Sequence, residues 1–128
     1  MGYCLLLLFA SGAWSEEPGT RAVRKHFAEE NNIQSTSGTV ETSIKFINKS
    51  KQPIKVYWLD YEGKRKLYAT VKDGDSHELK TYLTHPWLIT DADDNAWYVY
   101  FPDAQPRTVE IVPPKKNEPA SISSTPRP

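Results

Sequence analysis

Six side chains that could form a binding site lie close together between Val56 and Ala92. They combine aromatic rings with a hydroxyl and an imidazole: Trp58, Tyr68, Thr81, Tyr82, His85 and Trp87. Aromatic rings offer flat apolar faces, whereas a hydroxyl and a neutral imidazole can both donate and accept hydrogen bonds. Core filling alone explains this mixture of side chains poorly. The mixture instead predicts a pocket for a small, partly polar group.

The elements that must position these side chains are short strands. The first alternates, with Ile44 and Phe46 on one side and Ser43 and Lys45 on the other, as a half-buried strand requires. Turn-forming residues such as Asp73-Gly74 separate the later runs. Seven strands are predicted, at Thr39–Ile47, Ile54–Tyr61, Leu67–Val71, Glu78–Leu83, Trp87–Thr90, Ala96–Phe101 and Thr108–Val112. This spacing predicts an all-β fold, a seven-stranded antiparallel β-sandwich.

The composition excludes several classes of function. The chain has 128 residues, which is typical of one domain, and its 16 basic residues balance its 16 acidic residues. We therefore expect no binding to nucleic acid or to an anionic membrane. Cys4 is the only cysteine, which excludes an internal disulfide or a cysteine-based metal site. His26 and His77 are predicted to be surface residues, and neither has a partner at metal-ligand spacing, so no metal or cofactor is expected.

Both ends of the chain differ in composition from the middle. The apolar run Leu5–Ala10, followed by Ala13-Trp14-Ser15, predicts a signal peptide over residues 1–15 and a secreted or periplasmic protein. The start lacks Lys and Arg, which leaves a cytoplasmic location as the alternative. The run is too short for a membrane span, which takes roughly 20 residues. Residues 16–37 are expected to form a weakly ordered lead-in, in which Thr20 could cap a helix of two or three turns. The domain would occupy residues 38–113, before a disordered, proline-rich tail over 114–128.

A set of motifs runs through the stretch from Phe46 to Ala92. They are Phe46-x-Asn48-x-Ser50, Trp58-Leu59 followed by an aromatic residue and Gly63, Tyr68, Gly74, Tyr82, His85-x-Trp87-Leu88 and Asp91-Ala92. With these motifs the stretch resembles the β domain of the von Hippel–Lindau tumour suppressor family. In that family the β domain recognises peptides that bear 4-hydroxyproline. Carried over by position, the resemblance implies a pocket of Trp58, Tyr68, Thr81, His85 and Trp87, with Tyr82 in support.

Two positions depart from the family. Thr81 stands where the family has serine, so the hydroxyl is kept and a methyl group is added. Pro86 removes one backbone donor beside the pocket. The family's full-length tumour suppressor also has a helical domain that recruits elongin C and a cullin ligase. Only sixteen residues follow Val112 here, so elongin and cullin recruitment is not expected.

The function predicted from these residues is non-catalytic binding of hydroxyproline-containing peptides or proteins. The alternative is a transthyretin-like or carbohydrate-binding β-sandwich, in which exposed coplanar rings form a platform for a sugar. An enzyme is not predicted, because the sequence shows neither a serine–histidine–acid set nor a phosphate-binding glycine loop. Other interpretations also remain: Trp58 and Trp87 could be core residues, and Asn48-Lys49-Ser50 could be an N-glycosylation sequon or a structural turn.

Overall fold

The computed structural model of the chain describes residues 23–115 and 121–123, so the predicted signal peptide lies outside the described residues. All seven predicted strands are confirmed, and the fold is an all-β sandwich. The strands are β1 (Glu41–Asn48), β2 (Ile54–Leu59), β3 (Arg65–Val71), β4 (Ser76–Tyr82), β5 (Trp87–Asp91), β6 (Ala96–Tyr100) and β7 (Arg107–Ile111). An eighth strand, β8 (Ser121–Ser123), falls in the tail that was predicted to be disordered.

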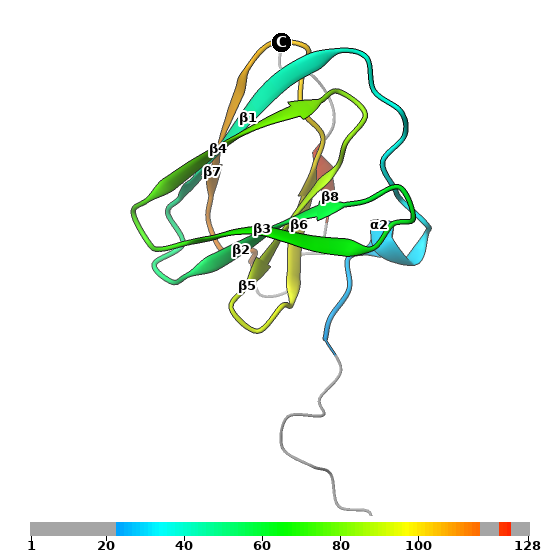
Figure 1. Cartoon of the computed structure of the whole chain (residues 1–128). Coiled ribbons are helices and arrows are strands. Elements are labelled where there is room, and N and C mark those ends of the chain that lie inside the picture. Colours follow the sequence, from blue (N-terminus) through cyan, green and yellow to red (C-terminus); the bar gives the residue numbers. More distant parts are fainter. Residues whose placement is uncertain (1–22, 116–120, 124–128) are drawn as a thin grey trace, which may run out of the picture.

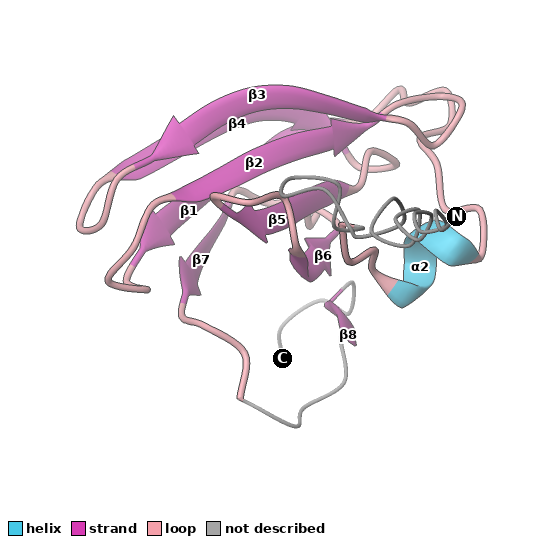
Figure 2. Ribbon diagram, turned by 90° about the horizontal axis from the view of Figure 1, so that it is seen from below, coloured by secondary structure: helices cyan, strands magenta, loops and turns pink. Residues whose placement is uncertain are grey.

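The strands form two sheets that face each other (Figures 1 and 2). One sheet has the order β4-β1-β7, and the other has the order β3-β2-β5-β6-β8. Two of the pairings, β1 with β7 and β6 with β8, are parallel. The sandwich is therefore not wholly antiparallel as predicted, because the chain crosses from one sheet to the other between β6 and β7 instead of making a hairpin.

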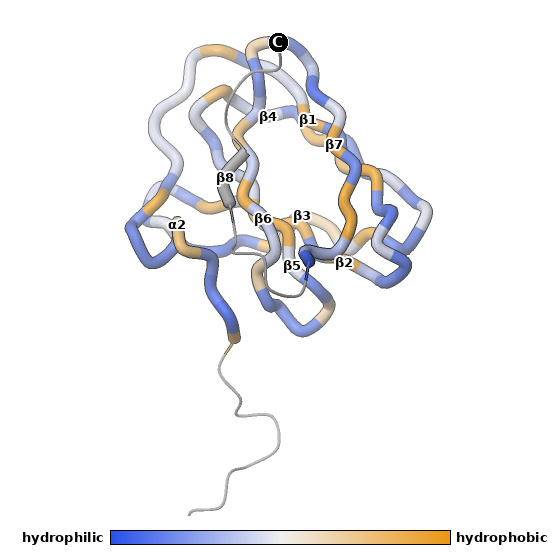
Figure 3. Tube along the Cα trace, turned by 180° about the vertical axis from the view of Figure 1, so that it is seen from behind, coloured by the Kyte–Doolittle hydropathy of each residue, from blue (hydrophilic) through white to orange (hydrophobic). Residues whose placement is uncertain are grey.

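The main core lies between the two sheets, where apolar positions alternate along the strands. Ile44 and Phe46 of β1 are fully buried, as are Ile54 and Val56 of β2. Figure 3 shows apolar stretches on strands of both sheets. Val40, which the predicted strand Thr39–Ile47 included, precedes β1, and its side chain is 45% exposed.

A second apolar cluster lies on the other face of the larger sheet, where the lead-in covers it. Ala28 of the one-turn helix α2 (Phe27–Glu30) packs with Leu59, Leu88 and Val99. Residues 87–90 of β5 are consequently buried on both faces of the sheet. Part of the segment that was expected to be weakly ordered thus contributes to the interior.

The helix itself differs from the prediction. It has a single turn, and its N-cap is His26 rather than Thr20, which lies outside the described residues. His26 Nδ1 accepts from the Ala28 amide at 2.9 Å, and Glu29 accepts from the His26 amide at 2.8 Å. His26 is fully buried, so the prediction of a surface histidine was wrong. Capping explains why, since its ring accepts a backbone hydrogen bond beneath the first turn.

Arg65, the first residue of β3, fastens this helix to the sheet. Its guanidinium donates to both carboxylate oxygens of Glu29, at 2.7 and 2.9 Å, and to the Asp94 carbonyl at 2.7 Å. The side chains of Arg65 and Glu29 are only 18% and 6% exposed.

Within the described residues, no helix is long and apolar enough to cross a membrane.

The turn between β1 and β2 is built around the buried side chain of Asn48. Its amide nitrogen donates to the carbonyls of Gln52 and Val71, each at 2.8 Å. Its carbonyl oxygen accepts from the Ser50 amide at 2.9 Å and from the Ser50 hydroxyl at 2.6 Å. Asn48 is fully buried, so this amide acts as an internal template for the turn.

Candidate functional site

The predicted site residues come from four strands and one connection. Trp58 lies near the end of β2, and Trp87 is directly opposite it at the start of β5. Thr81 and Tyr82 end β4, and His85 lies in the connection from β4 to β5. The Leu59 amide donates to the Pro86 carbonyl at 3.2 Å, so this connection is tied to β2 beside the tryptophans.

Tyr68 reaches the same place because β3 is irregular. Val56 pairs with Ala69 and the next residue, Tyr57, pairs with Leu67, which leaves Tyr68 as the extra residue of a β-bulge. A bulge bends the strand and redirects its side chains, and bulges are frequent beside functional sites. Here Tyr68 is 50% exposed, and its ring leans on Trp87.

The rings meet mostly edge to face. Tyr68 stands perpendicular to Trp87, with 5.0 Å between ring centroids, and at 79° to Trp58, with 6.2 Å between centroids. The His85 ring lies 5.3 Å from Trp58 and 5.3 Å from Tyr82. The structure therefore brings Trp58, Tyr68, Tyr82, His85 and Trp87 into one cluster.

Thr81 joins this cluster through a hydrogen bond rather than through ring contact. Its Oγ1 accepts from Trp87 Nε1 at 3.0 Å, and both residues are buried, with exposures of 6% and 2%. A hydroxyl that accepts in this way keeps its own hydrogen to donate. Trp87 therefore belongs to the core, as one interpretation of the sequence had it, and also orients a polar group at the cluster.

His85 is 7% exposed, and this burial lowers the pKa of its imidazole below the ordinary value because it penalises the charged ring. A hydrogen bond with the backbone of Thr36 raises the pKa, although by less. A bond that favours the charged ring is one in which the ring donates, so the Thr36 carbonyl is the acceptor. The ring is thus held neutral near pH 7 and carries one acceptor nitrogen.

Sequence reasoning missed two contributions to this cluster. The first is Tyr61, whose hydroxyl lies 3.3 Å from His85 Nε2 and whose ring lies 5.3 Å from Trp58. The second is the lead-in, which supplies Thr36 and is anchored by the Ser35 hydroxyl donating to the Leu59 carbonyl at 2.6 Å. The position of Tyr61 was a usable signal, because a residue in the turn after Trp58 must lie near the end of that strand.

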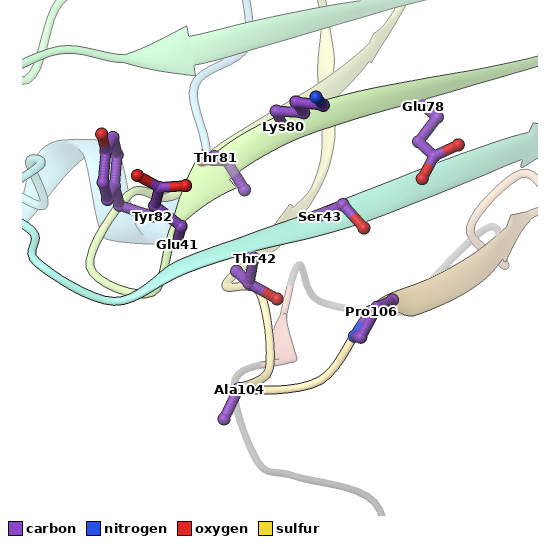
Figure 4. Close-up of a pocket in the computed structure, with 9 residues that line it drawn as sticks. All are labelled: Glu41, Thr42, Ser43, Glu78, Lys80, Thr81, Tyr82, Ala104 and Pro106. Atoms are coloured by element: carbon purple, nitrogen blue, oxygen red, sulfur yellow. The ribbon is translucent and has the colours of Figure 1, made fainter.

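Two surface hollows flank the cluster. One, of about 360 Å³, is lined by Trp58 and Tyr61 together with Asp60, Glu62 and Lys66. The other is a groove of about 740 Å³ on the smaller sheet (Figure 4). Its lining comes from β1, β4 and the segment before β7: Glu41, Thr42, Ser43, Glu78, Lys80, Thr81, Tyr82, Ala104 and Pro106. Thr81 thus links the aromatic cluster to the groove.

One donor in the cluster is without a partner among the described residues. Trp58 Nε1 is buried and makes no hydrogen bond there. Leaving a buried donor unpaired costs roughly 1–3 kcal/mol, and such groups are uncommon in native proteins.

Among the residues that the structure describes, no group of three or more His, Cys, Asp or Glu side chains could hold a metal ion.

The fold and the cluster together define a class of protein, an all-β sandwich domain that carries a cluster of aromatic and polar side chains. Residues 33–100 match the family described as the VHL beta domain, which is more than half of the chain. The chain therefore belongs to the VHL β-domain family, and the resemblance found in the sequence is confirmed. The domains of this family recognise substrates, and the family is not a catalytic one.

Proposed function

We propose that this domain is a non-catalytic module that binds peptides or proteins containing 4-hydroxyproline. The pocket would consist of Trp58, Tyr68, Thr81, His85 and Trp87, with Tyr82 in support. The observation that carries the proposal is the presence of a hydroxyl and an imidazole in one cluster of aromatic rings: the Thr81 hydroxyl, which accepts from Trp87, and the neutral His85 ring, which contacts Trp58.

These two groups match the ligand hydroxyl. The Thr81 hydroxyl keeps a hydrogen to donate to it, and the His85 nitrogen that carries no hydrogen accepts from it. Trp58 and Tyr68 provide apolar faces for the pyrrolidine ring. Plain proline would occupy the same space and leave the Thr81 hydroxyl without a partner for its hydrogen. A buried group left unpaired costs roughly 1–3 kcal/mol, so a preference for hydroxyproline of about 10- to 100-fold is within reach.

The rest of the peptide has a surface on which to lie. β4 is an end strand of its sheet, with β1 as its hydrogen-bonded neighbour in the described residues. An extended peptide could therefore add to the free edge of β4 through backbone hydrogen bonds. Thr81 and Tyr82 end this strand and also line the groove of Figure 4, which would take flanking side chains. Trp58 Nε1 would gain an acceptor if a peptide carbonyl lay beside it.

The geometry fits the alternative of a sugar-binding platform less well. A sugar platform requires exposed coplanar rings, whereas Tyr68 is perpendicular to Trp87, and Trp87 is 2% exposed. The rings of Tyr68 and Trp87 therefore do not offer a common flat surface.

The test is calorimetric titration of the full chain with matched peptide libraries that differ only at proline or 4-hydroxyproline. We expect hydroxyproline peptides to bind about 10- to 100-fold more tightly than their proline counterparts. His85→Ala should reduce most of that preference, whereas Trp87→Ala should weaken both peptides. Equal affinity of the folded wild-type domain for both peptides would reject the proposal.

A further inference from the structure

The hydroxyl of Tyr61 already contacts the imidazole of His85, at 3.3 Å from Nε2. A neutral imidazole has one N–H group, and the backbone hydrogen bond with Thr36 raises the pKa of His85, as donation by the ring does. We assign that N–H group to Nδ1, which leaves Nε2 with only a lone pair. In this tautomer Tyr61 is the donor in its hydrogen bond with His85.

The turn that carries Tyr61 holds it there while leaving one side of the ring in solvent. Asp60 Oδ1 accepts from the amides of Glu62 and Lys64, at 2.8 and 2.9 Å. Gly63 completes the turn with a φ of 80°, a conformation that favours glycine. Tyr61 is 52% exposed, so its ring can turn away from His85 without disturbing the core.

We propose that Tyr61 is a specificity-determining residue that satisfies His85 whenever the ligand does not. This inference rests on the proposed function. When the pocket is empty or holds proline, the Tyr61 hydroxyl donates to Nε2, so proline leaves no unpaired acceptor behind. When hydroxyproline enters, its hydroxyl must displace Tyr61. Tyr61 therefore makes proline easier to accept and hydroxyproline harder to bind, which narrows the difference between the two ligands.

Removing the Tyr61 hydroxyl should raise the preference for hydroxyproline, whereas loss of an ordinary pocket residue would lower it. Tyr61→Phe keeps the edge-to-face contact with Trp58, at 5.3 Å and 86°, and removes only the hydroxyl. Nε2 then pairs with water in the empty pocket and loses that water when proline binds. The affinity ratio of hydroxyproline over proline should consequently rise. A neutral hydrogen bond changes an equilibrium by roughly 2- to 10-fold, and the ratio should rise by that factor.

A second measurement follows the pair without any ligand. A donor to Nε2 stabilises the neutral ring, so Tyr61→Phe should raise the pKa of His85 in an NMR titration of the free protein. The titratable side chains whose rings contact this imidazole are Tyr61, from the turn, and Tyr82, from β4. No charged side chain contributes to the shift among the described residues. Tyr82→Phe removes a hydroxyl from the other ring, which contacts His85 without a hydrogen bond in the described structure, and should leave the pKa unchanged.

The experiment is calorimetric titration of the wild type, Tyr61→Phe, His85→Ala and the double variant with both peptides. We expect a higher ratio for Tyr61→Phe, and no effect of that substitution in the His85→Ala background, because Tyr61 acts through His85. A lower or unchanged ratio would overturn the inference while leaving the proposed function intact. If neither peptide bound the wild type, both would fail, and a rise in the pKa would then show only that the pair exists.

Discussion

The ion pair between Arg65 and Glu29 gives a prediction that is independent of any ligand. Glu29→Gln preserves the size of the side chain and one oxygen that can accept from Arg65 or from the His26 amide, but removes the negative charge. The pair is bidentate and largely buried, with exposures of 18% and 6%. The loss of unfolding free energy should therefore lie between two limits. A surface ion pair contributes about 0–1 kcal/mol, and a fully buried pair that loses one partner costs about 3–5 kcal/mol.

Arg65 would keep its bond to the Asp94 carbonyl at 2.7 Å, which places the expected loss in the lower half of that interval. We expect Glu29→Gln to lower the free energy of unfolding by about 2 kcal/mol at pH 7. A domain of this size loses roughly 4–8 °C in Tm for each kcal/mol. The measurement is urea unfolding followed by tryptophan fluorescence. The matched control is Glu110→Gln, because Glu110 and Lys49 are 60% and 56% exposed and 3.7 Å apart, and we expect a loss below about 0.5 kcal/mol.

The pH dependence provides a second criterion for the same pair. Burial raises the pKa of Glu29, but hydrogen bonds from Arg65 and from the His26 backbone, together with the positive charges of Arg65 and Lys25, outweigh it, so the pKa in the folded state is lowered. The stabilisation by the carboxylate is therefore complete above roughly pH 4.3, the usual pKa of an unfolded glutamate, and is lost as the pH falls through the folded pKa. The difference between wild type and variant should shrink on acidification. A loss below about 0.5 kcal/mol at pH 7, or a loss that stayed constant down to the acid limit of folding, would refute this reasoning.

Two further predictions concern the pocket and the turn. Preference for hydroxyproline should fall on acidification, because the charged ring of His85 can only donate; burial lowers its pKa, so the midpoint should lie below about 6.5. Calorimetry from pH 7 down to the acid limit of folding measures this midpoint, and a preference that stayed unchanged after an NMR titration showed the His85 ring to be charged would mean that His85 is not the acceptor. Asn48→Ala leaves its buried partners unpaired and should cost about 3 kcal/mol in urea unfolding; a loss under about 1 kcal/mol would contradict the role of the turn.

The strands were predictable because burial on one face leaves a period of two in the sequence. Ile44 and Phe46 show this directly. The parallel pairing of β1 with β7 was not predictable in the same way, because alternation does not reveal which strand lies beside which. The segment β8 has three residues, which is too short for a period of two to show in the sequence, and it pairs with β6 in parallel.

The candidate site was predictable in its residue types but not in its geometry. A bulge, invisible in the sequence, turns Tyr68 toward Trp87. His26 has the composition of a surface residue, yet it is buried as a helix cap. Thr36 acts through its backbone, so its side-chain type gave no signal. These features were not predicted for one of two reasons. Some depend on a contact between segments far apart in the chain, and others depend on backbone hydrogen bonds, which residue type does not reveal.

The burial of Asn48 also determines whether this residue can be glycosylated once the chain has folded. Asn48-Lys49-Ser50 fits the acceptor sequence, but both hydrogens of the side-chain amide are already donated in the folded protein. A sugar would replace one of those hydrogens and would have no space, since the residue is fully buried. Folding and glycosylation at this position are therefore mutually exclusive, and whichever happens first prevents the other. A glycan found on Asn48 would mark a molecule that had been modified before the turn closed.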